Sequence, residues 1–262
     1  MPEMPLSMLV ARSLSSMSSG ARPTAPMSPR LGFKAMCNLY TTKLSRDEVR
    51  SLFRHRVLVE TNYRDGMNVY PNGEAPVMVL DADGKVAIKD MRWGFPPPPV
   101  FGSKRPVTNV RNTTSSYWKP WLKAPSVEVG KDVGGRCLVP VSRFAEPDKN
   151  TGLKVNGKPS ENRWFARPDG SLFAFAGIWR TWTGDRGTMA KSDVGQHHLY
   201  SFLTTDSAEV VKPIHDKATP LILTTKEEIE TWLTAPMDEA LKLQKPAKKG
   251  VIVLLPIEKK AA

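Results

Sequence analysis

The sequence predicts an α+β fold with a largely antiparallel sheet. Short apolar runs bounded by Gly, Pro and Asp recur along the chain, a pattern typical of strands. The 23 Pro and 18 Gly among 262 residues indicate many turns rather than a helical bundle. Strand-like and helix-like segments do not alternate in a βαβ rhythm, which disfavours a doubly wound parallel sheet.

Several segments are predicted to form the strands of the core. Residues 68–94 contain two apolar runs on either side of Asp83-Gly84, a dipeptide typical of hairpin turns. Three further runs, rich in apolar and aromatic residues, are predicted to be buried strands. They are "RCLVPVSRF" (136–144), "SLFAFAGIW" (171–179) and "YSFLTT" (200–205).

Helices are predicted mainly from capping boxes, in which a Ser or Thr is followed three residues later by Glu. Ser45 with Glu48 and Thr225 with Glu228 have this spacing, each at the start of an apolar stripe. A third, short helix is expected where aromatic residues cluster. The predicted helices cover 44–54, 225–233 and 115–122.

The chain is predicted to have three parts. Residues 1–35 are rich in Ser, Pro and Met and contain a single acid, Glu3. We expect them to be a disordered leader, either a mis-assigned start or a removed segment, with an organelle transit peptide as an alternative. A globular domain is predicted over 36–245, followed by a basic C-terminal tail over 246–262. Within this tail, "KPAKKG" and "EKKAA" are expected to be solvated, whereas the apolar run 251–255 ("VIVLL") fits a buried strand.

Composition favours a polyanionic partner. The net charge is +12, of which the leader contributes +3 and the remaining chain +9. Such a balance suggests nucleic acid, although basic charge that only aids solubility is an alternative. Two cysteines give no disulfide framework and no zinc pattern, and no apolar run is long enough to span a membrane. We expect a cytoplasmic protein without metal or cofactor.

Cys37 directly follows a methionine, Met36, that could itself be the start. Removal of Met36 would leave a thiol beside a free α-amine, whose reference pKa of roughly 7.7–8.0 is far below that of Lys. An aldehyde could form an imine with the amine, and the thiol could then close a thiazolidine ring. The commoner fate of a lone Cys, a small buried apolar residue, is the alternative.

Other candidate groups are weaker when taken alone. Trp93, beside Arg92 in "RWGFPPPP", could stack on an unpaired base or be a core residue. Asn109 and Arg111 would share one face of an extended segment and could orient a nucleophile and hold a phosphate.

Two further side chains could move protons. Glu146 ends an apolar run, where a carboxylate could act as general acid or base, and an exposed loop carboxylate is the alternative. His215 could shuttle protons near neutral pH, although a lone His is more often structural.

Several motifs follow one another in a specific order and spacing. They are Met36-Cys37, "RWGF" (92–95), "TNVRN" (108–112), "RCLVPVSRFAE" (136–146), "FAFAGIW" (173–179), "FLTTDSAEV" (202–210), "IHDKATPLIL" (214–223) and "TWL" (231–233). In this joint order and spacing, from Met36 to about residue 241, the chain resembles the SOS response-associated peptidase (SRAP) family.

The resemblance implies a single domain with a barrel-like, largely antiparallel mixed sheet and flanking short helices. It implies a sensor of abasic sites in single-stranded DNA within the DNA-damage (SOS) response. The N-terminal cysteine of such a protein forms a covalent thiazolidine crosslink with the aldehyde of the ring-opened sugar. Family members are also described as peptidases that remove the residues before the cysteine.

Carried over by motif position, the resemblance assigns four catalytic residues. Cys37 is the nucleophile, and Asn109 positions the cysteine or the open sugar. Glu146 assists ring opening and proton transfer, and His215 is linked to proton transfer and to reversal of the crosslink. The implied DNA-binding residues are Trp93, Arg111, Arg92, Pro71 and Thr204.

The chain also departs from the family pattern. Asn38-Leu39 stands where many members have Gly-Arg, which removes or moves one DNA contact. While residues 1–36 remain attached, Cys37 has no free amine and cannot form a thiazolidine.

Three functions are therefore kept open. The first is the crosslinker, acting as a monomer on single-stranded DNA that contains abasic sites, in the cytoplasm and at the nucleoid when bound. The second is a thiol peptidase that removes its own leader, using Cys37 with His215 or Glu146. The third is a non-catalytic single-stranded nucleic-acid-binding module.

Overall fold

The computed structural model describes residues 39–45, 47–49, 58–59, 66–81, 83–98, 105–123, 134–148, 154–155, 158–159, 161–187 and 191–257. All of them belong to one compact unit, Ala35–Ala262. The predicted leader lies outside the described residues.

Short strands dominate this unit. In chain order the elements are β1 (Leu39–Thr42), β2 (Leu58–Val59), β3 (Met67–Val69), β4 (Glu74–Leu80), β5 (Val86–Trp93), β6 (Asn109–Val110), α2 (Lys119–Leu122), β7 (Gly134–Val141), β8 (Arg143–Asp148), β9 (Lys154–Val155), β10 (Lys158–Pro159), β11 (Glu161–Ala166), β12 (Phe173–Asp185), β13 (Val194–Thr205), β14 (Thr219–Pro220), β15 (Ile222–Leu223), α3 (Lys226–Thr234), α4 (Met237–Leu241) and β16 (Val253–Leu254). The predicted α+β class, sheet-rich with few short helices, is confirmed.

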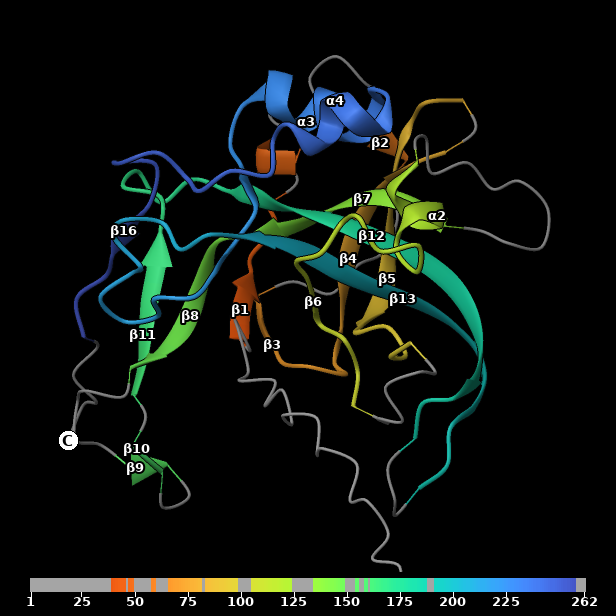
Figure 1. Ribbon diagram of the computed structural model, residues 1–262, viewed down its shortest axis with the longest axis horizontal. Coiled ribbons are helices and arrows are strands. Elements are labelled where there is room, and N and C mark those ends of the chain that lie inside the picture. The colour runs from red at the N-terminus through yellow and green to blue at the C-terminus, as the bar shows by residue number, and fades with distance from the viewer. Residues whose placement is uncertain are drawn as a thin grey trace, which may run out of the picture. The chain divides into compact units, whose positions relative to one another are not determined.

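The larger sheet is mixed and closes on itself. Its strand order is β14-β13-β12-β7-β4-β5-β2, with β15 on β12 and β6 on β13. A parallel pairing between β13 and β5 joins two strands that are distant in this order, so β13, β12, β7, β4 and β5 form a ring. In Figure 1, α3 and α4 lie together on one side of this sheet.

The second sheet is antiparallel, with the order β16-β11-β8-β1-β3. β1, β8 and β11 stand side by side in Figure 1. The chain passes between the sheets at Ser142, which separates β7 from β8 and whose N–H and hydroxyl both donate to the Thr41 carbonyl. The segment predicted as one strand over 136–144 is therefore two strands in different sheets.

Side-chain alternation along the ring strands produces two hydrophobic clusters, because successive residues of a strand point to opposite faces. In β12, Ala174 and Ala176 belong to the cluster that contains the helix residues Ile229 and Trp232. Phe175 of the same strand belongs to the other cluster, which is rich in aromatic rings. That aromatic cluster also contains Tyr40, Phe144 and Phe165 of the second sheet and Trp93, Tyr200 and Phe202 of the ring.

Local sequence signals form as predicted. The Thr225–Glu228 capping box is complete at the start of α3. Ser45 and Glu48 make the reciprocal hydrogen bonds of the other box, and residues 47–49 are helical. Of the helix predicted over 44–54, Leu44 precedes the box, and residues 46 and 50–54 lie outside the described residues.

The hairpin turn also forms as predicted. β4 and β5 pair in antiparallel fashion, and the Asp81 carboxylate accepts the N–H groups of Asp83 and Lys85. Gly84 at φ +73° supplies the left-handed backbone that the turn requires. The helix predicted over 115–122 is shorter than expected: only its second half, α2 (Lys119–Leu122), is α-helical.

The C-terminal segment is not a solvated tail throughout. β16 pairs with β11, and Ile252 is only 2% exposed because it packs into the aromatic cluster. The apolar run 251–255 thus packs against the domain, in agreement with the buried strand expected there. Across the part of the chain that the structure describes, no helix combines the length and apolar character needed to cross a bilayer.

Trp93 corrects a site prediction. Its side chain is fully buried, its ring lies against those of Tyr40, Tyr200 and Phe202, and its Nε1 donates to the Thr108 carbonyl at 3.0 Å. A ring enclosed by three others has no free face on which a base could stack. The structure therefore supports the core alternative for Trp93.

Replacing Trp93 by Ala should chiefly destabilise the fold. We expect Trp93→Ala to lower the free energy of unfolding by about 3–5 kcal/mol, because a large cavity opens in the aromatic cluster. Urea unfolding measures this, and Trp182→Ala, at a half-buried site on the β12–β13 hairpin, is the control with a smaller loss. Unchanged stability of Trp93→Ala together with lost DNA affinity would contradict the core role.

Candidate active site

Glu146 and His215 form the centre of the candidate site. Glu146 lies in β8 and is 1% exposed, while His215 is 8% exposed and follows a helical turn after β13. The His215 Nδ1 atom lies 3.7 Å from the Glu146 Oε2 atom. Segments that are far apart in the sequence thus bring a carboxylate and an imidazole together, as their predicted roles in proton transfer require.

The hydrogen bonding of His215 assigns its tautomer. Nδ1 lies 3.0 Å from the Ala218 carbonyl, which can only accept, so Nδ1 must carry a hydrogen. In the neutral ring, Nε2 is then the nitrogen with a free lone pair. His215 can therefore take up a proton at Nε2 while its orientation stays fixed through Nδ1.

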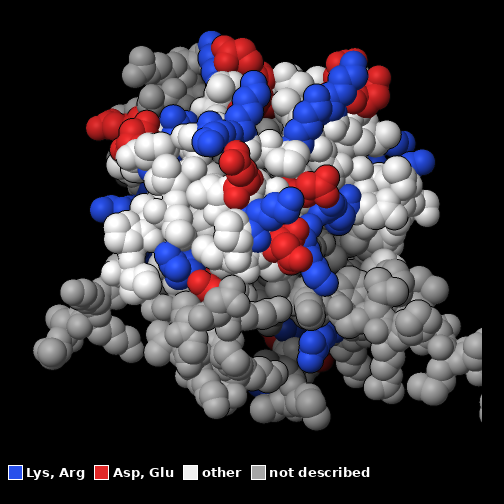
Figure 2. Space-filling view, turned by 60° about the vertical axis from the view of Figure 1, so that its left-hand side comes forward, with Lys and Arg blue, Asp and Glu red and all other residues white. Residues whose placement is uncertain are grey.

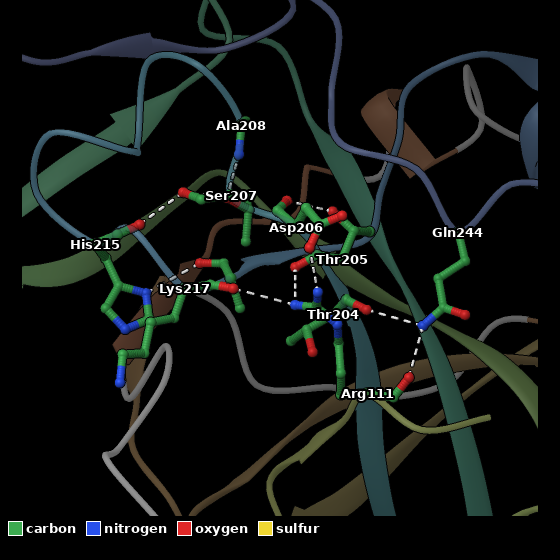
Figure 3. Close-up of polar contacts among 11 residues, drawn as sticks. Arg111, Thr204, Thr205, Asp206, Ser207, Ala208, His215, Lys217 and Gln244 are labelled. Atoms are coloured by element: carbon green, nitrogen blue, oxygen red, sulfur yellow. Dashed lines mark hydrogen bonds and ion pairs between the residues drawn. The ribbon is translucent and has the colours of Figure 1, made fainter. Parts of the chain in front are cut away.

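The loop that carries His215 is held by its own hydrogen bonds. The Ser207 hydroxyl donates to the His215 carbonyl, and the Ala208 N–H donates to the Thr219 hydroxyl (Figure 3). The His215 N–H donates to the Val211 carbonyl, which closes the helical turn. Since β14 pairs with the end of β13 through Thr205 and Thr219, both ends of the loop are anchored to one strand pair.

Asn109 stands on β6, which pairs in parallel with β13 opposite Phe202. Its Nδ2 donates to the Thr108 hydroxyl at 3.0 Å. Its Oδ1 is buried and has no hydrogen-bond partner among the described residues, and the same holds for the Thr204 hydroxyl on β13. Buried polar atoms without a partner are uncommon in proteins, and ordered water or a bound group commonly satisfies them.

Arg111 is tied to the end of β13 and to the His215 loop. Its NH1 donates to the carbonyls of Thr205 at 2.6 Å and Lys217 at 3.2 Å, and its NH2 pairs with the Asp206 carboxylate (Figure 3). The Arg111 side chain is 43% exposed, so the predicted phosphate contact is accessible. Its positive charge already has a partner within the protein.

Arg92 is committed to internal ion pairs. Its NH1 lies 2.7 Å from the Asp193 carboxylate and its NH2 lies 3.7 Å from the Glu74 carboxylate, with the Arg92 side chain 18% exposed. Its guanidinium charge also helps to lower the pKa of neighbouring Arg186 to about 10, although burial of Arg186 is the larger cause. These contacts leave little of the charge of Arg92 for a DNA strand.

Pro71 is exposed in a tight turn that is tied to β5. The Asn72 N–H donates to the Trp93 carbonyl, and the Trp93 N–H donates to the Gly73 carbonyl. Asn72 adopts a left-handed conformation at φ +67°, which Asn tolerates better than most residues. The turn is therefore a fixed surface feature, and the DNA contact of Pro71 stays a prediction.

Cys37 and Met36 lie outside the described residues. The first described residue, Leu39, begins β1 and stands opposite Ala145 of β8, the residue before Glu146. Cys137, the other cysteine, is fully buried in the aromatic cluster, and burial raises the pKa of its thiol well above the usual value. A thiol in that condition is inert, which agrees with the structural role predicted for Cys137.

Gln244 is a site residue that the sequence did not reveal. Its Nε2 donates to the carbonyls of Arg111 at 3.0 Å and Thr204 at 2.9 Å (Figure 3). Its Oε1 accepts from the Thr113 hydroxyl at 3.1 Å. One amide group therefore connects the chain after α4 to the ends of β6 and β13. No motif surrounds Gln244, so only the fold identifies it.

The charges on the visible face of the molecule are mixed. Figure 2 shows Lys and Arg side chains beside Asp and Glu side chains, rather than basic side chains gathered in one patch. Among the described residues, no group of three or more His, Cys, Asp or Glu side chains could hold a metal ion.

Comparisons with known proteins agree with this architecture. Residues 36–261 match the family model described as SOS response associated peptidase (SRAP), so the chain belongs to the SRAP family. It is a DNA-damage-associated SRAP protein, from a family associated with abasic-site processing. No curated protein matches the chain.

Solved structures share the fold at low identity. A protein from Bordetella bronchiseptica is 20% identical, with a TM-score of 0.62, over 84% of this chain and 100% of its own. A protein from Bacteroides thetaiotaomicron is 19% identical, with a TM-score of 0.57, over 82% and 90% of the two chains. A phage-related protein from Bordetella bronchiseptica is 17% identical, with a TM-score of 0.59, over 85% and 95%.

Gln244→Glu should loosen the C-terminal segment from the site. A carboxylate cannot donate to the carbonyls of Arg111 and Thr204, and its charge would face two carbonyl oxygens. We expect a loss of unfolding free energy of about 2–3 kcal/mol and faster amide exchange in residues 242–257.

Two comparisons sharpen that measurement. Gln244→Met, which loses the donors without adding charge, should fall between the wild type and Gln244→Glu. Gln196→Glu, at an exposed position in β13, should change neither quantity. Equal stability of wild type and Gln244→Glu would remove the connecting role assigned to Gln244.

Proposed function

We propose that this protein forms a covalent thiazolidine crosslink between Cys37, as N-terminal residue, and the ring-opened sugar of an abasic site in single-stranded DNA. It would act as a monomer, in the cytoplasm and at the nucleoid when bound to DNA. Family membership supports a role at abasic sites. The observation that carries the proposal is the juxtaposition of the β1 start with Glu146 and His215.

Covalent geometry limits how far Cys37 can lie from these groups. Leu39 is paired with Ala145, the neighbour of Glu146 in β8. A chain spans at most about 3.6 Å per residue, so the Cα atom of Cys37 lies within roughly 7 Å of the Leu39 Cα atom. The proposal takes the Cys37 side chain and its terminal amine, on this short tether, to reach the Glu146 and His215 pair.

The proposed reaction needs only a proton acceptor and a proton donor. The Cys37 amine adds to the sugar aldehyde, and loss of one water gives an imine. The thiol then adds to the imine carbon and the nitrogen gains a proton, which closes the five-membered ring. Atoms balance with the release of one water, and no oxidant or metal is consumed.

The site residues divide the proton transfers. Glu146, at the edge of the core, would assist opening of the sugar ring and release of the water. His215 Nε2 would accept the thiol proton and return it when the crosslink reverses. Asn109 would offer its buried Oδ1 to the amine or to a sugar hydroxyl, which would satisfy that atom.

The central test compares single-stranded DNA that contains one abasic site with the same DNA without the lesion. Protein that begins at Cys37, incubated with a single-stranded oligonucleotide containing one abasic site, should give a band that resists denaturing electrophoresis. Cys37→Ala should lose this band completely, because without the thiol the imine cannot close to a thiazolidine ring. The same oligonucleotide without the lesion should give no band.

The outcomes separate the competing functions. A denaturant-resistant band of equal strength with Cys37→Ala would refute the proposal. A complex that salt or denaturant dissolves, with no covalent band from either protein, would favour a non-catalytic binding module instead.

A linked activity, removal of the leader by the protein itself, is supported by the description of the family as a peptidase. The full-length chain has an acylated nitrogen at Cys37, so the leader must leave before a thiazolidine can form. We expect intact mass spectrometry to show time-dependent loss of residues 1–36, slowed at least tenfold in Glu146→Ala, since general acid–base groups contribute about 10²–10⁴-fold to rates. An unchanged full-length mass after long incubation would exclude this activity.

A further inference from the structure

Arg111 and Asp206 form an exposed ion pair beside the candidate site. Asp206 follows β13 directly, and its side chain is 82% exposed, against 43% for Arg111. The Thr205 hydroxyl donates to the Asp206 carbonyl at 2.6 Å, which helps to fix the backbone from which the carboxylate extends. Figure 3 shows the two side chains meeting at the base of the His215 loop.

The two terminal nitrogens of the Arg111 guanidinium make different contacts. NH1 is held by two backbone carbonyls, those of Thr205 and Lys217, and remains anchored whatever happens to Asp206. NH2 pairs with the Asp206 carboxylate on the solvent side. A guanidinium binds carboxylate and phosphate oxygens in the same way, so Asp206 occupies the position that a strand phosphate would take.

An exposed ion pair of this kind is easily exchanged. Such pairs contribute little to stability, because both charges stay partly hydrated and are screened by salt. A phosphate can therefore displace Asp206, but the displaced carboxylate remains nearby and repels the strand.

We propose that Asp206 is a specificity-determining residue that competes with DNA phosphate for Arg111. It lowers the affinity for intact single strands, so that lasting capture depends on the reaction at a lesion. The inference rests on the proposed function, because it takes Arg111 as a contact to the DNA strand.

The test is binding of the full-length chain to an intact single-stranded oligonucleotide, measured by fluorescence anisotropy over a range of salt concentrations. One additional phosphate contact steepens the slope of log K against log salt by about 0.7, which corresponds to about fivefold in affinity at about 0.1 M salt. Asp206→Asn should show both changes. The fold should be retained, because the NH1 bonds to Thr205 and Lys217 remain.

Two matched variants isolate the Arg111 contact. Asp83→Asn makes the same change in net charge at another exposed ion pair, with Lys85, in the β4–β5 turn, and should leave the slope unchanged. In an Arg111→Gln background, Asp206→Asn should no longer raise affinity, since the contact it releases is absent.

The outcomes separate the role of Asp206 from the proposed function. Unchanged or weaker binding by Asp206→Asn overturns the inference, as does a gain that persists with Arg111→Gln or appears equally in Asp83→Asn. If Asp206→Asn fails in this way while the Cys37 crosslink forms on lesion DNA, the proposed function stands without it. If none of the proteins binds the intact strand and no crosslink forms on lesion DNA, both the proposed function and the role of Asp206 are refuted.

Discussion

The pairing of β1 with β8 is the constraint on which the candidate site depends. β8 exists as a separate strand because the chain turns at Ser142, where two hydrogen bonds to the Thr41 carbonyl fasten it to β1. Glu146 is thereby placed in the second sheet, one residue from the partner of Leu39. This paired strand brings Leu39, the first described residue, close to Glu146 in the neighbouring strand.

The rest of the site is assembled on β13. This strand pairs with β5, β6, β12 and β14, so its C-terminal end is fixed by the ring of the larger sheet. The His215 loop leaves from that end, and Arg111 and Gln244 bind the carbonyls of Thr205 and Thr204 there. In this region the charge of Arg111 is paired with that of Asp206 within the protein.

Much of the fold and part of the site could be predicted from local signals. The capping boxes and the Asp83-Gly84 turn are set by short-range patterns and form as predicted. The apolar runs also mark strands of the ring, although the run predicted over 136–144 divides into β7 and β8. The burial of Trp93 could not be predicted, because a Trp at the end of a strand suits both a core and a stacking surface. Its neighbours Tyr40 and Tyr200 are brought to it only by pairing between distant strands.

Long-range pairing also determines the place of the C-terminal part and of the polar contacts. The apolar run 251–255 fits a buried strand on sequence alone, but only the fold shows that β16 pairs with β11. Gln244 contacts the backbone carbonyls of Arg111 and Thr204, which are far away in the sequence. Asp206 pairs with the Arg111 guanidinium, and no motif spacing links these two residues. Joint motif order, by contrast, brought together Glu146 and His215, which the structure places 3.7 Å apart.

The central claim is that Cys37 becomes the N-terminal residue beside this acid–base pair. The most direct measurement is the N-terminal residue of the protein isolated from the cells that make it, read by mass spectrometry of its N-terminal peptide. The account predicts a peptide that begins with Cys37 and carries a free amine. A mature chain that keeps residues before Cys37, or carries a blocked amine on it, would contradict the account, because no thiazolidine could form.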